Sequence, residues 1–397
     1  MSVNFPLAVS SWDYQELDAI QSVVDSSMFS MGPRVSEFES AFAEKFGAKH
    51  CVMVNSGSSA NLLMIASLFF KKDSPLQRGD EVIVPAVSWS TTYAPLQQYG
   101  LHVKFVDVCP KTLNIDISKF EQAVSAKTKV VLLVNLLGNC NDFGQIASIL
   151  DSKELSPYIL EDNCESMGAT LNKINAGTFG LMGTFSTFFS HHISTMEGGC
   201  ILTDDDELHQ ILICIRAHGW TRNLPEDNLI TGKKSNVSFD ESFKFVLPGY
   251  NLRPLEMSGA IGLVQLKKLD ELLEGRRENA LYFCEKISGL SSVSVQKEVG
   301  SSSWFGFSLI VSDSARYERQ DLLNALDLAG IEYRPIVTGN FLKNSQLLNY
   351  FDYEISGDVT GADLVERQGL FVGNHHFNLR NGIDLLTKTI MELEGTV

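Results

Sequence analysis

The chain has 397 residues, of which 44% are hydrophobic and 20% are charged. This composition is typical of a soluble globular protein, and the length allows two domains or one large α/β unit with an appendage. The formal net charge of −16 argues against nucleic acid or an anionic membrane as a partner, although it leaves room for a local basic pocket that binds a phosphorylated ligand.

The sequence shows no sign of export or of membrane insertion. The N-terminal segment, residues 1–7, lacks the charged start and the long apolar core of a secretory signal, and the longest apolar stretch, residues 62–70, is too short to span a bilayer. We therefore expect a cytoplasmic protein. Its seven cysteines are scattered without a Cys-x-x-Cys pair or a Cys/His cluster, which favours reduced, mostly buried thiols over disulfides or a zinc site.

Short apolar strands alternate with helices over the first two-thirds of the chain, which predicts an α/β fold. We expect a helix from Ala60 to about Phe70. Strands are expected at residues 52–54, 81–85, 103–108, 130–135, 158–161, 185–190 and 200–203. Nearly continuous apolar strands indicate a mostly parallel sheet that is buried on both faces, and ligands bind such sheets beyond the carboxyl ends of the strands.

We place a domain boundary near residue 265, between a large domain, residues 1–265, and a smaller C-terminal α/β domain, residues 266–397. A long helical pattern from about Pro254 to Ile287, broken or bent near Gly275, links the two. The smaller domain is predicted to contain strands at residues 304–311 and 332–336 and helices at residues 319–329 and 382–393.

Three groups of polar or aromatic residues follow the expected strands. Ser56, Gly57 and Ser58 lie between a strand and a helix, where free N–H groups and the helix dipole can bind an anion, although the same pattern describes an ordinary helix N-cap. Trp89 follows the strand that ends at Pro85, and a tryptophan there is more often part of the core. The third group begins at Asp162.

Asp162 closes the strand at residues 158–161 and is followed by Glu165. A carboxylate at a strand end can hold the N–H of a pyridinium ring and keep the ring electron-withdrawing. The alternative is a loop carboxylate that caps the next helix.

His191 and His192 come at the end of the expected strand at residues 185–190. Adjacent residues on a strand point to opposite faces, so one metal ion would rarely bind both, and we expect no metal site. A packed or exposed pair of imidazoles is the alternative to a functional pair.

Several stretches resemble signature motifs of the DegT/DnrJ/EryC1/StrS family of pyridoxal-phosphate-dependent sugar enzymes. The resemblance runs from about Phe5 to the last helix and is most specific at residues 84–93, 161–169, 186–199, 216–225, 243–254, 302–307 and 332–341. It implies the fold of fold-type I enzymes, like that of aspartate aminotransferase. It also implies homodimers in which each active site is built from two subunits.

The resemblance assigns a role to each candidate residue. Cofactor binding is implied for Ser56, Gly57, Ser58, Trp89, Asp162, Glu165, Ser186 and Asn251, with Asn251 reaching the phosphate in the neighbouring subunit. Substrate binding is implied for His218, at the edge of the site, and for Arg253, which would meet the anionic amino donor.

His191 occupies the position at which the family carries a lysine. A lysine amine can form a Schiff base with an aldehyde cofactor, whereas an imidazole cannot, but an imidazole can move protons. Glu165 departs from the usual glutamine, as in the 3-dehydratase branch of the family. We therefore expect a cofactor that is not covalently bound, and elimination in place of amine transfer.

The expected cofactor is pyridoxal 5'-phosphate, which cycles with pyridoxamine 5'-phosphate. The resemblance implies L-glutamate as amino donor and a GDP-hexose, GDP-4-keto-6-deoxy-D-mannose, as substrate. His191 would act first as general base and then as general acid while the C3 hydroxyl leaves as water. Two alternatives stay open: a nucleotide-sugar 4-aminotransferase that uses another residue for the proton, and a non-catalytic cofactor-binding paralogue. The complete set of cofactor-binding residues argues against the paralogue.

Overall fold

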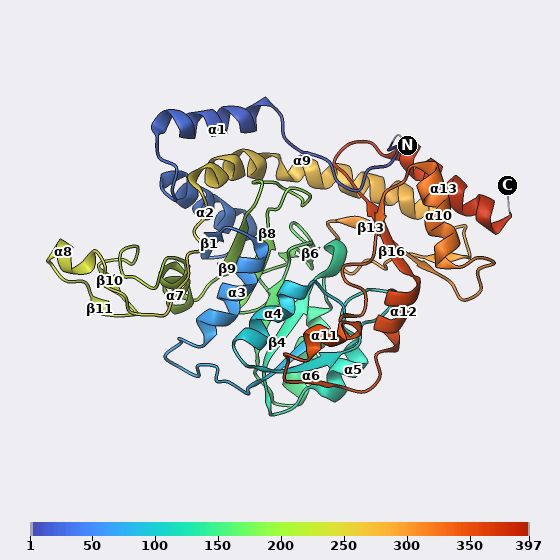
Figure 1. Cartoon of the computed structure of the whole chain (residues 1–397). Coiled ribbons are helices and arrows are strands. Elements are labelled where there is room, and N and C mark those ends of the chain that lie inside the picture. Colours follow the sequence, from blue (N-terminus) through green and yellow to red (C-terminus); the bar gives the residue numbers. More distant parts are fainter. Residues whose placement is uncertain (1–2, 396–397) are drawn as a thin grey trace.

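The computed structural model describes residues 3–395. Residues 1 and 2, part of the N-terminal segment in which the sequence predicts no secretory signal, lie outside the described residues. An eight-stranded sheet forms the centre of the molecule (Figure 1). Its strands, in spatial order, are β1 (His50–Val54), β9 (Gly199–Thr203), β8 (Met182–Ser186), β5 (Tyr158–Asp162), β4 (Thr128–Val134), β2 (Glu81–Pro85), β3 (His102–Val106) and β15 (Tyr353–Ile355). All neighbouring pairs are parallel except those of β9, which is antiparallel to both β1 and β8. The expected mostly parallel sheet is confirmed.

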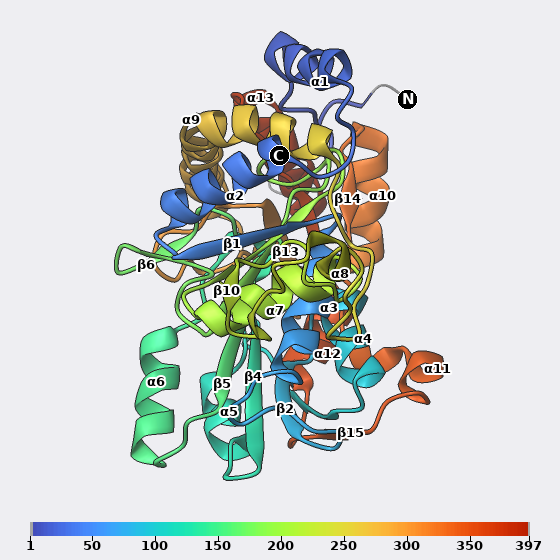
Figure 2. The ribbon, with the colours of Figure 1, turned by 90° about the vertical axis from the view of Figure 1, so that its left-hand side faces the viewer.

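Helices cover both faces of this sheet (Figure 2). They are α3 (Gly57–Leu68), α4 (Ser90–Gln98) and α7 (Asp206–Arg216) on one face, and α5 (Ile117–Ala123) and α6 (Phe143–Ser152) on the other. Val82 and Val84 belong to the core with α3 and α4, whereas Ile83 between them belongs to the core with α5 and α6. The strands are apolar throughout because alternate side chains enter different cores, and both cores exclude water.

A second, antiparallel sheet lies in the C-terminal part of the chain, in the order β12 (Val293–Ser294), β13 (Gly306–Val311), β16 (Gly369–Gly373) and β14 (Tyr333–Arg334). Its core includes residues of α10 (Arg319–Ala329) and α13 (Arg380–Glu394). Phe5, from the N-terminal end of the chain, also belongs to this core, and β15, from the C-terminal part, pairs with β3 in the large sheet. Each of the two predicted domains therefore contains a segment from the other end of the chain. The division at residue 265 stays a prediction.

The remaining short elements are β6 (Thr170–Leu171), β7 (Ile174–Asn175), β10 (Asp227–Asn228), β11 (Gly232–Lys233), α8 (Ser238–Glu241), α11 (Ser345–Leu348) and α12 (Thr360–Gln368). Two N-terminal helices, α1 (Tyr14–Ser26) and α2 (Pro33–Phe46), pack against the long helix α9 (Glu256–Ile287). The Asp13 side chain and Glu16 form a capping box at the start of α1. No helix in residues 3–395 is both long and apolar enough to cross a membrane.

Two sequence predictions about element boundaries are wrong. The strand expected at residues 185–190 ends at Ser186, because the chain then leaves β9 and folds into a loop. In this loop the N–H of Thr187 donates to the carbonyl oxygen of Gly198, and the N–H of Thr195 donates to the carbonyl oxygen of Thr187. The helix α9 is continuous through Gly275, so the predicted break there is wrong, whereas a bend stays a prediction. A Cβ atom at Gly275 would lie 2.0 Å from the carbonyl oxygen of His376, so this glycine allows a close approach and does not break the helix.

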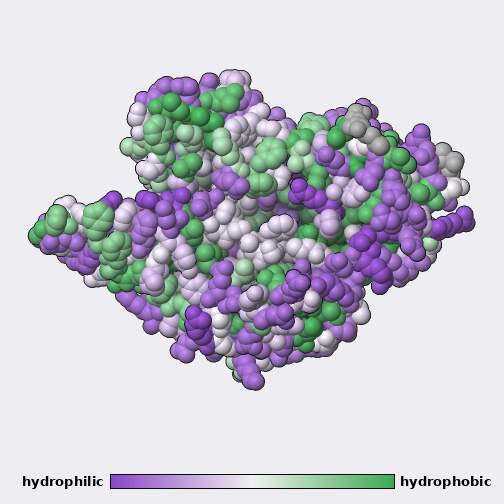
Figure 3. Space-filling view, viewed as in Figure 1, coloured by the Kyte–Doolittle hydropathy of each residue, from purple (hydrophilic) through white to green (hydrophobic). Residues whose placement is uncertain are grey.

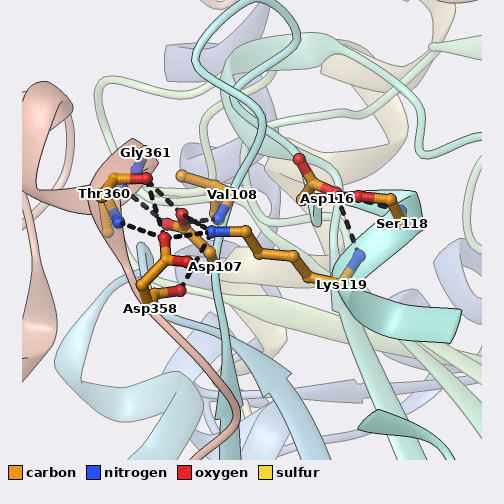
Figure 4. A network of polar contacts seen from close by, with 9 residues as sticks. Asp107, Val108, Asp116, Ser118, Lys119, Asp358, Thr360 and Gly361 are labelled. Carbon is orange, nitrogen blue, oxygen red and sulfur yellow. Dashed lines mark hydrogen bonds and ion pairs between the residues drawn. The ribbon is translucent and has the colours of Figure 1, made fainter. Parts of the chain in front are cut away.

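A buried carboxylate docks α12 on the large sheet (Figure 4). Asp107, just after β3, accepts hydrogen bonds from the N–H groups of Gly361 and Ala362 in the first turn of α12. Lys119 of α5 bridges Asp107, at 2.9 Å, and Asp358, at 2.5 Å. The carboxylate satisfies N–H groups that have no acceptor within the helix, and its charge complements the helix dipole.

Candidate functional site

A cavity of about 270 Å³ lies beyond the carboxyl ends of β1, β2, β5 and β8, where the sheet pattern predicted a ligand site. Residues of the C-terminal part, among them Phe305 and Arg334, close its other side. Eight of the eleven predicted site residues line it: Ser56, Gly57, Ser58, Trp89, Asp162, Glu165, Ser186 and His191. The cavity is thus the place where most of the predicted residues meet.

The start of α3 forms one end of the cavity. The Ser56 hydroxyl caps the helix by accepting from the N–H of Ser59, and the Ser58 hydroxyl lies 2.7 Å from that of Thr91. The first N–H groups of a helix have no intrahelical acceptor and lie at the positive end of the dipole. Ser186, at the end of β8, adds another hydroxyl to the cavity wall. This end is built to bind an anion such as a phosphate.

Asp162 is a buried carboxylate without a cationic partner among residues 3–395. One of its oxygens accepts hydrogen bonds from Asn61 and Thr92, each at 2.8 Å, and the other accepts from the N–H of Cys164 at 3.1 Å. These neutral donors orient the carboxylate but leave its charge uncompensated, and burying such a charge is costly. A pyridinium N–H⁺ in the cavity would supply the missing cation.

Glu165 brings a second acid into the cavity. Its carboxylate accepts from the N–H of Leu137 at 3.0 Å. Burial, with a smaller contribution from the nearby Asp162 charge, raises the pKa of Glu165 to about 7 against the hydrogen bond from Leu137, which lowers it. Near neutral pH this side chain can therefore both donate and accept a proton.

Trp89 lines the cavity at the start of α4 and is 55% exposed. The alternative prediction, that Trp89 is part of the hydrophobic core, is wrong. An indole half open to a cavity offers a flat apolar face on which an aromatic ring can stack.

His191 lies in the loop after β8, half-buried, with its ring at the cavity. Burial, together with the Arg276 guanidinium, lowers the pKa of His191 to about 3. The imidazole is therefore neutral at physiological pH, which is the form that can accept a proton. His192 points away from the cavity and bonds to the carbonyl oxygen of Ser303 at 3.1 Å.

The other three predicted residues, His218, Asn251 and Arg253, lie outside this cavity in the single chain. The Arg253 side chain donates to Asn251 at 3.0 Å, and its guanidinium lies 5.7 Å from the Trp220 ring. His218 contacts the same indole, with ring centroids 5.0 Å apart. The three residues form a separate cluster, and their roles stay predictions.

Sequence reasoning missed Asn61 and Thr92, which hold Asp162, and Phe305 and Arg334, which close the cavity. The sequence does mark Asn61, because it is a polar residue within the apolar stretch at residues 60–66 of α3. Thr92, Phe305 and Arg334 lie in the family-like segments 84–93, 302–307 and 332–341, but a resemblance of segments does not say which side chains meet in the cavity.

The donor set fits a phosphorylated pyridine ring. Hydroxyl groups and a helix N-terminus suit the phosphate, the Asp162 carboxylate suits a protonated ring nitrogen, and Trp89 suits the ring face. No group of three or more His, Cys, Asp or Glu side chains suited to a metal ion occurs in residues 3–395.

Comparisons with known proteins show the family of the chain. A model of the DegT/DnrJ/EryC1/StrS aminotransferase family matches residues 11–372. The chain is 63% identical over 381 residues to the GDP-4-keto-6-deoxy-D-mannose 3-dehydratase of Yersinia pseudotuberculosis, and the alignment covers 96% of each.

Two solved structures are similar over nearly the whole chain. One is a GDP-4-keto-6-deoxymannose-3-dehydratase with a trapped PLP-glutamate geminal diamine, and the other is a mutant of such an enzyme with bound GDP-perosamine. Each is 59% identical, has a TM-score of 0.96, and is matched over 98% of this chain and 100% of its own. This likeness confirms the aminotransferase-like fold that the sequence predicted. The chain belongs to the DegT/DnrJ/EryC1/StrS aminotransferase family.

Proposed function

We propose that this chain removes the C3 hydroxyl group of GDP-4-keto-6-deoxy-D-mannose, using pyridoxal and pyridoxamine phosphate as cofactor and L-glutamate as amino donor. The products are GDP-4-keto-3,6-dideoxy-D-mannose, 2-oxoglutarate and ammonia. The observation that carries this proposal is a neutral histidine, His191, at a cavity that no lysine lines within the described residues. The names of the similar enzymes, and the PLP-glutamate and GDP-perosamine bound to two solved relatives, support it.

When bound, the cofactor supplies an electron-withdrawing ring and a transferable amino group. Asp162 holds the protonated ring nitrogen and so maintains that electron demand. His191 accepts a proton as a neutral imidazole and then, as an imidazolium, donates it to the departing C3 hydroxyl. Glu165, with its pKa raised to about 7 by burial, holds a proton near the ring substituents.

The test is the fate of the nitrogen. The chain is incubated with GDP-4-keto-6-deoxy-D-mannose, pyridoxal phosphate and ¹⁵N-glutamate, and the sugar and the ammonia are analysed by mass spectrometry. We expect one labelled ammonia and one 2-oxoglutarate for each deoxygenated sugar. A ¹⁵N-labelled 4-amino sugar would instead establish the aminotransferase alternative.

The cofactor is expected to bind without a covalent link, because an imidazole cannot form a Schiff base. Borohydride reduction of the loaded protein followed by intact-mass analysis should leave the chain unmodified. Free lysine mixed with the cofactor serves as the positive control for reduction. A cofactor adduct on any lysine of the chain would contradict this prediction.

The active form is proposed to be a homodimer with shared sites. Apolar side chains gather at two places on the face in Figure 3: on α1, and on the arm formed by residues 225–245, which projects beside α7. Phe239, Phe243 and Phe245 of the arm are 86%, 69% and 57% exposed. Contiguous exposed aromatic residues mark protein interfaces. In the proposed dimer, the second copy supplies Asn251 and Arg253 to a cavity that lacks them in the single chain.

Shared sites can be detected by mixing two inactive variants. Asn251→Ala chains and His191→Ala chains, unfolded and refolded together, should regain activity, because hybrid dimers contain one intact site. Refolding each variant alone gives the control and should yield no recovery. If hybrids form, as shown by differently tagged chains, yet remain inactive, each site is built from one subunit only.

A cytoplasmic location is part of the proposal. Its support is that all seven cysteines are free, which suits a reducing compartment.

A further inference from the structure

Residues 302–305, which we call the strap, run behind His191 and His192. Each of the four strap carbonyl oxygens accepts a hydrogen bond from a different side chain: Ser302 from Arg277 at 3.0 Å, Ser303 from His192 at 3.1 Å, Trp304 from Asn374 at 2.8 Å, and Phe305 from Arg276 at 3.1 Å. Trp304 has a φ of 47°, a strained value that persists only where its surroundings over-determine it. The strap is therefore held rigidly.

The strap places the Phe305 ring against both histidines. Its centroid lies 5.2 Å from that of His191 and 5.6 Å from that of His192. Nδ1 of His191 is buried and has no hydrogen-bond partner among residues 3–395. Apart from Phe305, the ring contact of His191 is the edge of Phe188 at 5.8 Å. Aromatic packing, and above all the anchored Phe305, thus sets the orientation of the imidazole.

Arg276 anchors the strap and also acts on the charge of His191. It is only 6% exposed, and its Nη1 donates to the carbonyl oxygens of Phe305 and Asn374. It has no ion-pair partner in the described part of the chain. A buried cation without a counter-ion opposes a second positive charge nearby. Burial is the larger cause and Arg276 the second, and together they lower the pKa of His191 to about 3.

Other charged groups line the cavity that holds the imidazole. They are Asp162, Glu165, Glu197 and Arg334, and His192 adjoins His191 on the loop. Besides burial, the charge that opposes the imidazolium of His191 is that of Arg276. Of the two arginines that anchor the strap, Arg277 acts on His192, whereas Arg276 acts on both histidines.

We propose that Arg276 and Phe305 are positioning residues for His191: the buried charge of Arg276 adds to burial in keeping the imidazole neutral, and Phe305, anchored by Arg276 through the strap, keeps the ring directed into the cavity. The chemical role of His191 rests on the proposed function. The protonation and orientation of its ring do not, because they are properties of the protein alone.

The first test measures protonation without any reaction. Cofactor-free protein labelled with ¹⁵N-histidine is titrated by NMR, and the His191 signal is identified by its loss in His191→Asn. We expect His191 to stay neutral down to pH 5 in the wild type, and Arg276→Met to move its pKa back toward the ordinary value of about 6.5. Arg276→Lys, which keeps the charge, should behave like the wild type.

Arg277→Met is the matched control. Arg277 is the next residue of α9 and binds the same strap, through Ser302, but it acts electrostatically on His192 and not on His191. This variant should loosen the strap, seen as a lower melting temperature, and leave the titration of His191 unchanged. An unchanged His191 titration in Arg276→Met, or an equal shift in Arg277→Met, would overturn the role of Arg276.

The second test concerns orientation. Phe305→Leu should lower kcat for deoxygenation at least about tenfold at unchanged cofactor affinity, because a small misplacement of a proton-transfer group is costly. Phe305→Tyr, which keeps the ring, should restore most of the rate. Wild-type kcat in Phe305→Leu would overturn the role of Phe305. If the wild type does not deoxygenate the sugar at all, the proposed function fails, while the NMR titration still decides the role of Arg276.

Discussion

Replacement of His191 by alanine is expected to slow C3 deoxygenation by about 10²–10⁴-fold, the usual contribution of a general acid–base group. Cofactor affinity should change little, because the proposed contacts to the phosphate, the ring nitrogen and the ring face are those of the cavity residues Ser56, Asp162 and Trp89 and not of the imidazole. Equilibrium dialysis of pyridoxal phosphate gives the cofactor affinity, and stopped-flow mixing of the loaded variant with substrate gives the single-turnover rate.

His209→Ala provides the control for this experiment. His209 stacks on His50, with ring centroids 3.9 Å apart, and does not line the cavity. Its removal should leave the single-turnover rate unchanged. Undiminished dehydration in His191→Ala would show that another group moves the proton, and Glu165 would be the next residue to test.

Asp162→Asn is expected to weaken cofactor binding and to slow turnover, each by about 100-fold. A hydrogen bond to a charged group contributes about 1.5–3 kcal/mol. The side-chain amide of the variant would also place an N–H group where the carboxylate oxygen is proposed to accept from the ring nitrogen. The Asn61 donor would then face an amide in place of a carboxylate. Equilibrium dialysis of pyridoxal phosphate and the initial rate of deoxygenation give the two values.

The neighbouring residue supplies a control on the same strand. Glu161 points to the opposite face of β5 and accepts hydrogen bonds from the N–H groups of Gly177, Phe179 and Gly180. Glu161→Gln should lower the melting temperature without a comparable loss of cofactor affinity. Equal losses of affinity in the two variants would mean that Asp162 acts through the stability of β5 and not through the cofactor.

Local sequence patterns specify the alternation of strands and helices and the residues at the strand ends. Serine and glycine before α3, and an acid directly after an apolar run at Asp162, are local signals, because turn and capping chemistry depends on adjacent residues. Local patterns thus marked Ser56, Gly57, Ser58 and Asp162, and the resemblance to family motifs added Trp89, Glu165, Ser186 and His191; all eight line the cavity.

Packing between distant segments specifies which groups act on those residues. Asn61 and Thr92 reach Asp162 across 101 and 70 residues of sequence, and a periodic pattern does not specify such partners. The antiparallel direction of β9 and the end of β8 at Ser186 likewise depend on pairing between strands. His191 could be named from the sequence, but its neutral state could not, because it depends on burial and on Arg276, which only the fold brings close.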